Sequence, residues 1–546
     1  MSEDNKHRLT RRHLTAAALA AAATGLVGLP GRAAATPLAG PLATAPHPAG
    51  AAASGAPFVV PALREWAGGE GEFRLSGAGR ITVPAGSDRL LRLARKVTAE
   101  IAELTGVRLR TPGFSDSAPH DGEIHIRVDS ADSHPAGGER YRTEGSRIVV
   151  GPAHVIITAP AYAGAFYATR SLLQILVGEG RRALPAGTAV DWPGYARRGF
   201  MLDVGRRWFE PSFVRDYVRY MSWFKYNTFQ IHLNDNEITA PDGDWSKAYS
   251  AFRLASDAPE LAGLAAEDGV YTRPMWDELE DVAADHCVQV IPEIDAPAHA
   301  RAFIEFKPEL GLHGGNSDHL DLTKPGTTEF MKSLYDEFVP WFRSPIVHFG
   351  ADEYPKEYAE QYRTYFNTIA AHLRSLGARP MAWGSMKWMT GTAEGYDRDV
   401  LLNMWSEDWY TPTMALEDGY HYVNTDDTNL YIVPLADYYH GRTGLDGAWL
   451  YQNWEPNVSR TERVEPMAPG LEGAMSAVWN DLVHADYDGE VVHGLVEPTF
   501  GLLAQKMWRG VQPGQTYEEF MAGVRRLGVG PGAEHLTSTL DSPPPR

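Results

Sequence analysis

Short apolar segments alternate with longer amphipathic segments from Asp191 to the end of the chain, and this alternation restricts the possible folds more than any other feature. About eight of the apolar segments have the continuous, β-prone character of buried parallel strands, for example residues 200–204, 228–233, 288–295 and 346–349. Eight parallel strands joined by helices are typical of a (β/α)8 barrel. The sequence therefore predicts an α/β protein with a TIM barrel over residues 191–530.

A smaller region with a mixed pattern precedes the predicted barrel. Within residues 56–190, strand-like segments and segments of helical spacing occur together, at 80–83, 90–104, 123–128, 147–150, 155–158 and 161–176. This mixture predicts a compact α+β domain. Because this region holds no nucleophile and no cluster of metal ligands, we expect it to have a structural role.

The first residues are typical of an export signal. Arg8, Arg11 and Arg12 precede an Ala/Leu-rich stretch, and Ala33–Ala35 offers a small-residue cleavage site, so residues 1–35 are predicted to be a signal peptide. The pair Arg11–Arg12 favours the twin-arginine route over an ordinary secretory signal. Residues 36–55 are predicted to be an Ala/Pro/Gly-rich linker, and residues 531–546 a disordered tail. We expect a secreted protein that is exported folded.

Charge and cysteine content exclude several classes of partner and linkage. The 546 residues carry a formal net charge of −20, with no long basic run outside the N-terminus, so binding to nucleic acid or to an anionic membrane surface is not expected. Cys287 is the one cysteine, so no disulfide can form within the chain.

Two adjacent carboxylates, Asp352 and Glu353, follow a predicted strand at Ile346–Val347. Where that strand breaks at Gly350, two successive side chains can approach one cavity. Two close carboxylates do not both ionise easily; one of them then acts as a general acid while the other stays charged. The dipeptide alone is a weak signal, since a solvated pair in a turn would look the same.

The other strand ends strengthen this interpretation. Polar or aromatic residues end nearly every strand segment: Asp203, Asp235, Asp295, Asp352, Glu353, Trp383, Trp405, Tyr431 and Trp479. In a TIM barrel these ends form the functional face. Carboxylates bind hydroxyl groups and transfer protons, and tryptophan faces pack against sugar C–H surfaces. Together they are typical of glycoside chemistry.

Other chemistries find less support. His232, Asp235, Asp295 and His299 could in principle chelate a metal, but no pair has the helical His-x-x-x-His spacing of a metal site. Asp295 and His299 are better interpreted as a hydrogen-bonded couple that tunes a nearby acid. Gly-x-Ser-x-Gly and phosphate-binding glycine motifs are both absent. We therefore expect neither a metal nor a cofactor.

Several motifs occur in the order found in one enzyme family. They are Arg198–Val204, Lys225–Asn227, His232–Asp235, Pro292–His299 and His348–Glu353, with Gly164–Gln174 upstream. In these motifs, from about Phe58 to beyond Trp479, the chain resembles family-20 glycoside hydrolases, the β-N-acetylhexosaminidase family. The resemblance implies substrate-assisted hydrolysis of glycans that contain N-acetylhexosamine, in which the sugar's own acetamido oxygen attacks the anomeric carbon.

The resemblance also implies a role for each matching residue. Glu353 would be the general acid and base, Asp352 would orient the acetamido N–H, and Tyr431 would donate to the acetamido oxygen. Substrate-binding roles fall to Arg198, Asp235, His299, Trp383, Trp405, Trp479 and Asp481, and supporting roles to Asp295 and His232. Structural alternatives remain open for three of these: a salt bridge for Arg198, core packing for Trp383 and strand packing for Tyr431.

Some positions depart from the family pattern. Val433 stands where an acid that binds a sugar hydroxyl is usual, Trp479-Asn480-Asp481 replaces Trp-x-Glu, Asn236–Glu237 follows Asp235, and Ala298 replaces a glycine. These departures resemble the dispersin-like and lacto-N-biosidase-like subset, which acts on longer glycans. Two alternatives to a β-N-acetylhexosaminidase therefore stay open: a lacto-N-biosidase or polysaccharide hydrolase with the same machinery, and a non-catalytic glycan-binding barrel.

Overall fold

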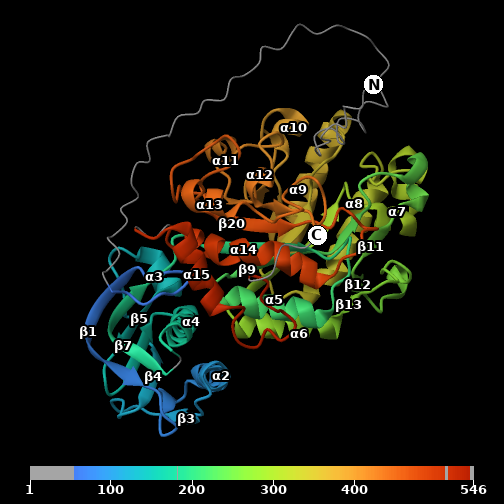
Figure 1. Cartoon of the computed structure of the whole chain (residues 1–546). Coiled ribbons are helices and arrows are strands. Elements are labelled where there is room, and N and C mark those ends of the chain that lie inside the picture. The colour runs from blue at the N-terminus through green and yellow to red at the C-terminus, as the bar shows by residue number, and fades with distance from the viewer. Residues whose placement is uncertain (1–54, 181, 511–513, 541–546) are drawn as a thin grey trace, which may run out of the picture.

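The computed structural model describes residues 55–180, 182–510 and 514–540 (Figure 1). The expected signal peptide, all but the last residue of the expected linker, and residues 541–546 lie outside this part of the chain. Within it, no helix is both long and apolar enough to cross a membrane.

Eight parallel strands form a closed barrel, as the alternating pattern predicts. In barrel order they are β8 (Arg197–Asp203), β9 (Thr228–His232), β14 (Gln289–Ala296), β15 (Ile346–Gly350), β16 (Arg379–Trp383), β17 (Leu401–Met404), β18 (Tyr422–Asn424) and β20 (Leu471–Val478). The barrel closes because β20 pairs in parallel with both β8 and β18. A short strand, β19 (Tyr431–Ile432), extends β20.

The connections after the strands differ in kind around the barrel. Longer helices follow five of the strands: α5 (Pro211–Trp223), α6 (Arg273–Asp285), α8 (Pro325–Phe338), α9 (Ala359–Ser375) and α14 (Gly489–Trp508). Short helices occupy the loops: α7 (Arg301–Phe306), α10 (Met386–Thr390), α11 (Pro412–Glu417), α12 (Asp427–Leu430) and α13 (Gly447–Asn453). Small strand pairs follow β9: β10 (Asn234–Asn236) with β11 (Ser250–Phe252), and β12 (Leu254–Ala255) with β13 (Tyr271–Thr272).

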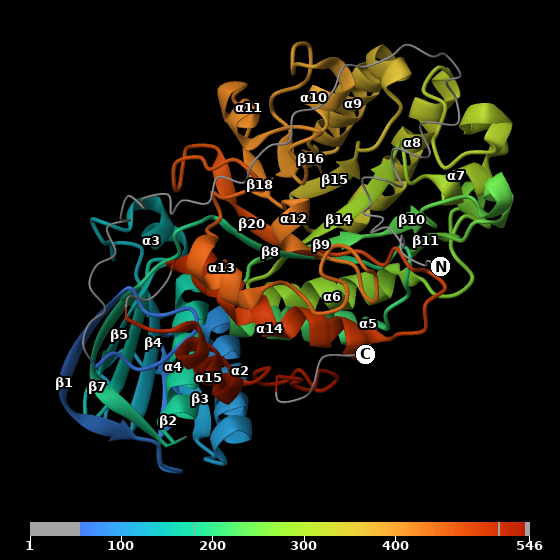
Figure 2. The same ribbon diagram turned by 45° about the horizontal axis from the view of Figure 1, so that its top comes forward.

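The N-terminal domain is the expected α+β unit. Its mixed sheet has the order β1 (Glu65–Arg74), β7 (Ala183–Asp191), β5 (Ser146–Val150), β6 (Val155–Ala159), β4 (Glu123–Val128), β2 (Arg80–Val83) and β3 (Arg110–Phe114). Helices α2 (Asp88–Thr105) and α4 (Tyr162–Gly178) pack on the sheet, and α3 (Gly138–Glu144) packs on α4. Figure 2 shows α4 between this sheet and the C-terminal helix α15 (Tyr517–Leu527). The sequence pattern did not reveal β1, β3 or β7.

Buried polar contacts join the two domains at the amino end of the barrel strands. Arg198, at the start of β8, is 0% exposed and forms an ion pair of 2.7 Å with Glu144 of α3, and its Nε donates to the carbonyl oxygen of Lys225. Lys225 and Trp508 both donate to the carboxylate of Asp191. The prediction that Arg198 binds substrate is therefore wrong, because its side chain is used at the barrel end opposite to Asp203.

The C-terminal segment corrects a second prediction. Residues 531–540, expected to be disordered, pack on the barrel helices: Ala533 and Leu536 belong to the hydrophobic core. Glu497 of α14 accepts hydrogen bonds from Ser538 and Thr539. Apolar residues spaced among prolines and glycines were enough to anchor this stretch, although its composition resembles a tail.

Candidate active site

The two adjacent carboxylates stand directly after β15. Gly350, the last residue of that strand, has φ +73°, and a Cβ atom there would lie 1.5 Å from Oδ1 of Asp295. Ala351 and Glu353 also have positive φ, of 69° and 43°. The chain thus turns sharply on leaving the strand, which brings two successive side chains, Asp352 and Glu353, to the same histidine, His299.

Asp352 is the more deeply placed of the two carboxylates. It is 8% exposed, and its Oδ1 has no hydrogen-bond partner in the described part of the chain. Burial raises the pKa of Asp352 to about 6; the nearby His299 opposes this shift and Glu353 adds to it. The carboxylate is therefore mostly ionised at neutral pH while one of its oxygens stays available to an N–H donor.

A charged chain fixes the position of His299 beside both acids. Its Nε2 lies 3.5 Å from Glu353 Oε2 and 3.8 Å from Asp352 Oδ2, while its Nδ1 lies 2.9 Å from Asp235 Oδ1. Although burial opposes it, Asp235 and Asp352 raise the pKa of His299 well above its ordinary value. Asp235 in turn forms an ion pair of 2.5 Å with Arg206. His299 is thus a cation held between three carboxylates.

The sequence-based pairing of His299 with Asp295 is wrong. The partner is Asp235 on β10, because the chain turns at His299, which has φ +54°. Neither carboxylate oxygen of Asp295 has a hydrogen-bond partner within the described residues. Burial, and next the charge of Asp352, raise the pKa of Asp295 well above its ordinary value, which favours the neutral form of this carboxyl.

A buried polar network lies in the barrel interior below the acids. His232 is 2.8 Å from Asp235 and 3.1 Å from Glu293. Glu293 also accepts hydrogen bonds from Gln230 and from the indole N–H of Trp383, at 2.7 Å each. Trp383 is 0% exposed, so its ring belongs to the barrel interior, as the core-packing alternative for this residue predicts. Sequence reasoning missed Glu293, although an acid in the middle of the apolar strand 288–295, two residues before Asp295, is a signal of a buried network.

The remaining predicted aromatic residues belong to the same buried cluster as Trp383. The ring of Trp479 lies 5.7 Å from both Trp383 and Tyr431, between centroids, and Trp405 belongs to the same cluster. The indole N–H groups of Trp405 and Trp479 are buried without an acceptor among the described residues, unlike that of Trp383. Buried indole N–H groups normally find an acceptor, so these two rings are suited to face a polar ligand.

Asp481 and an unpredicted arginine form the side of the site near β8. Arg206 Nη1 lies 3.2 Å from Asp203 and 3.6 Å from Asp481, and its guanidinium lies 5.8 Å from the centre of the Trp479 ring. The hydroxyl of Tyr438 donates to Asp481 at 3.3 Å. Arg206, and not the predicted Arg198, is therefore the arginine that lies near Asp481 at this face of the barrel. An arginine three residues after the strand-end Asp203 was the available signal.

Two groups of side chains have metal-ligand chemistry. In each group one ligand atom per residue lies within 4.8 Å of the others: His232, Glu293 and Asp295 in one, and Asp295, His299 and Asp352 in the other. Both histidines are engaged by carboxylates of the network, which accounts for the grouping without an ion. That no metal takes part stays a prediction.

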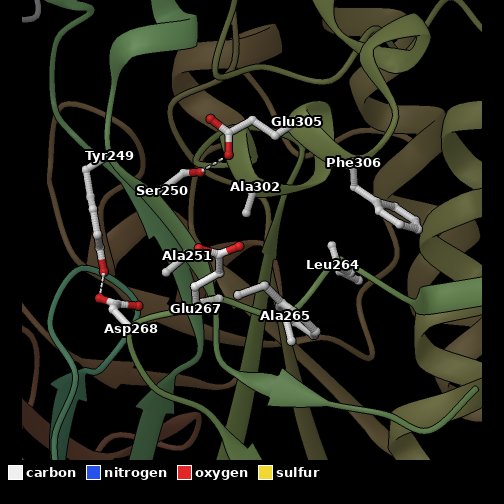
Figure 3. A pocket seen from close by; sticks show the side chains of 13 residues that line it. Tyr249, Ser250, Ala251, Leu264, Ala265, Glu267, Asp268, Ala302, Glu305 and Phe306 are labelled. Carbon is white, nitrogen blue, oxygen red and sulfur yellow. Dashed lines mark hydrogen bonds between the residues drawn. The ribbon is translucent and has the colours of Figure 1, made fainter.

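A separate cavity of about 500 Å³ lies between β11, residues 263–268 and α7 (Figure 3). Two of its acidic side chains are already engaged: Glu305 accepts a hydrogen bond from Ser250, and Asp268 accepts one from Tyr249. None of the predicted site residues lines this cavity. The chemistry therefore belongs to the carboxyl ends of the barrel strands.

A closed parallel barrel that presents paired carboxylates and buried tryptophans at these strand ends defines the glycoside hydrolase class. Comparison with known sequences gives the family. The model of the glycosyl hydrolase family 20 catalytic domain matches residues 195–364, and that of family 20 domain 2 matches residues 56–192. Together they match more than half of the chain, which belongs to glycosyl hydrolase family 20.

Individual relatives are similar at low identity. A lacto-N-biosidase of Bifidobacterium bifidum is 24% identical over 500 residues, which cover 86% of this chain and 42% of that protein. A beta-hexosaminidase of Vibrio furnissii is 26% identical over 60% of both chains. The chain thus spans less than two thirds of the length of these two relatives. The crystal structure of beta-N-acetylhexosaminidase from Bacteroides fragilis superposes with a TM-score of 0.69 at 25% identity, covering 86% of this chain and 94% of that one.

Gly350→Ala should displace Asp295 and the turn that positions the two acids. The added Cβ would overlap Asp295 Oδ1, and φ +73° is strained for alanine, so we expect destabilisation by more than about 3 kcal/mol and loss of activity. Thermal unfolding and turnover measure both effects. Gly377→Ala is the matched control: its φ is +86°, but nothing lies within 4 Å of the added atom, so about 1 kcal/mol is expected. Equal losses in the two variants would contradict the contact with Asp295.

Proposed function

We propose that the protein is a retaining β-N-acetylhexosaminidase that works by substrate-assisted catalysis. The observation that carries this proposal is the buried Oδ1 of Asp352, which has no hydrogen-bond partner among the described residues and lies next to Glu353, at the same barrel end as a cluster of buried tryptophans. A carboxylate oxygen without a protein donor suits the acetamido N–H of the substrate, and the adjacent acid suits the glycosidic oxygen.

In the first step the sugar supplies the nucleophile. Asp352 accepts the acetamido N–H, which turns the acetamido oxygen toward the anomeric carbon and balances the positive charge that develops on the amide. Glu353 donates its proton to the glycosidic oxygen as the bond from that oxygen to the anomeric carbon breaks. The new bond from the acetamido oxygen to the same carbon closes an oxazolinium ring. Tyr431, beside Trp479, is assigned the hydrogen bond to the acetamido oxygen.

In the second step water opens the ring. Glu353, now a carboxylate, removes a proton from the water as its oxygen attacks the anomeric carbon, and the acetamido group is restored. Two inversions at one carbon give overall retention. His299 is 3.5 Å from Glu353 and carries positive charge, so it lowers the cost of the carboxylate form between the two steps.

Glu353→Gln tests this assignment. The amide keeps the shape of the side chain but has no acidic proton to donate, so we expect kcat on a β-linked N-acetylglucosamine oligosaccharide to fall by about 10²–10⁴-fold. N-acetylglucosamine-thiazoline, which mimics the cyclised intermediate, should still bind both proteins tightly. An undiminished rate in the variant, or indifference of the wild type to the thiazoline, would overturn the proposal.

The fall of kcat/KM at low pH should follow the protonation of Asp352. This group must be ionised to accept the acetamido N–H, and its pKa is raised from 3.8 to about 6, so kcat/KM should fall by about tenfold per unit below pH 6. Asp352→Asn cannot ionise and should show a low rate without this fall. A wild-type profile that stays flat down to pH 4 would contradict the role of burial at Asp352.

A second candidate function is release of a disaccharide, and one position favours it. Val433 is 0% exposed and stands where an acid for a sugar hydroxyl is usual in the family, so the non-reducing sugar loses one polar anchor. The similarity to a lacto-N-biosidase over 86% of the chain supports the same interpretation. Export of the folded enzyme by the twin-arginine route is also proposed, on the basis of Arg11 and Arg12.

Release of p-nitrophenol from two glycosides separates the candidates. If the lost acid makes room for a further sugar, kcat/KM for the lacto-N-biose glycoside should exceed that for the N-acetylglucosamine glycoside by at least about tenfold. Val433→Asp restores the usual acid and should shift the ratio toward the monosaccharide. A strong preference of the wild type for the monosaccharide would exclude disaccharide release.

A further inference from the structure

We propose that Trp388 and Trp409 form an aromatic platform that binds a sugar ring of the leaving group, so that the substrates are oligosaccharides with at least one further ring beyond the cleaved bond. This inference rests on the proposed function and adds to it a specificity site that lies outside the family's motif residues. Below, "the aromatic platform" means these two side chains.

The aromatic platform continues the tryptophan wall of the site outward. The ring centroids of Trp405 and Trp409 are 5.4 Å apart with an interplanar angle of 33°, and those of Trp409 and Trp388 are 5.0 Å apart at 39°. Trp405 is 5% exposed, whereas Trp409 and Trp388 are half-buried. The three rings thus run from the buried site toward the surface, and the outer two retain accessible area.

The loops that carry the aromatic platform are tied to each other. Trp388 lies in α10, after β16, and Trp409 lies between β17 and α11. The backbone N–H of Trp388 donates to the carbonyl oxygen of Trp409 at 3.0 Å, and Lys387 Nζ donates to the carbonyl oxygen of Glu407 at 2.8 Å. Figures 1 and 2 both place α10 and α11 at the end of the molecule away from the N-terminal domain. The rings are therefore held in a fixed geometry rather than on loose loops.

The position of the aromatic platform relative to the acid identifies which part of the substrate it meets. Lys356 follows Glu353 by three residues, and its Nζ lies 5.8 Å from the centre of the Trp388 ring. The loop after the acid thus reaches over the platform. Glu353 protonates the oxygen of the leaving group, so the leaving group extends past Glu353, and the contact of Lys356 with Trp388 places the platform beside the loop that follows this acid.

The chemistry of the aromatic platform favours a sugar. A half-buried indole offers a flat apolar face, which packs against the C–H face of a pyranose, and the exposed ammonium of Lys356 adds a hydrogen-bond donor for hydroxyl groups. An extended peptide would instead need backbone partners at a strand edge, and barrel strands β16 and β17 are paired on both sides. A leaving group that consists of one or more sugar rings fits both observations.

Trp388→Ala and Trp409→Ala test the inference with two substrates that share the cleaved sugar. One is a β-linked N-acetylglucosamine oligosaccharide, and the other is the methyl glycoside, whose leaving group has no ring. We expect each substitution to lower kcat/KM for the oligosaccharide by about 3- to 10-fold, as the loss of one aromatic contact implies, and to leave the methyl glycoside unchanged. Phenylalanine at either position should recover most of the loss.

Two controls separate the possible outcomes. Trp449→Ala removes an indole that is 40% exposed on α13 and should change neither substrate. N-acetylglucosamine-thiazoline occupies the site without a leaving group, so its inhibition constant should be the same in all variants. Equal losses on both substrates, or weaker thiazoline inhibition, would show that the two tryptophans only pack the loops and would overturn the inference. If the wild type neither cleaves the oligosaccharide nor binds the thiazoline, the proposed function itself fails, and the inference falls with it.

Discussion

The buried carboxylate of Asp235 is the contact on which the arrangement of the site depends. It meets Arg206 from the β8 loop, His232 at the end of β9 and His299 from the β14 loop, all within 2.9 Å. Despite its burial, Arg206 and His299 keep the pKa of Asp235 well below its ordinary value. Buried charges are tolerated only when they are paired in this way. Three strand ends are therefore held together by one ionised group, and the histidine that faces the two acids is positioned as a result.

The chemistry at the acids follows from this arrangement. A neutral imidazole would leave the carboxylate of Asp352 without a counterion, whereas the cationic His299 lies beside Asp352 and also beside Glu353, which becomes a carboxylate only after it has given up its proton. Asp295 differs from these paired carboxylates. Since it is fully buried beside Asp352 and neither of its oxygens has a hydrogen-bond partner among the described residues, its pKa is raised and its neutral form is favoured. The site thus balances its charges by pairing some carboxyl groups and neutralising another.

The barrel and most residues of the candidate site could be predicted from the sequence, because the carboxyl ends of the strands in a barrel meet at one face. The alternating pattern was sufficient for the barrel, and Asp352, Glu353, Trp405, Tyr431, Trp479 and Asp481 do gather at that face. The wrong predictions are of two kinds: which end of a strand a side chain occupies, and which residue on another loop a side chain contacts. Arg198 and Arg206 both flank β8, but only the fold tells which end each occupies. Asp295 and Asp235 are equally plausible partners of His299 until the turn at residue 299 is known. Neither property has a local sequence signal.

One consequence follows from the hydrogen bond between Trp383 and Glu293. The indole of Trp383 is part of the barrel core and is held there by the network of Gln230, His232 and Glu293, so a shift of this ring would disturb the fold itself. Trp388 and Trp409 instead lie on loops that are hydrogen-bonded to each other, and both rings are half-buried. Changes at Trp383 or Glu293 therefore alter the fold and the site together, whereas the half-buried rings of Trp388 and Trp409 can change with less effect on the barrel core.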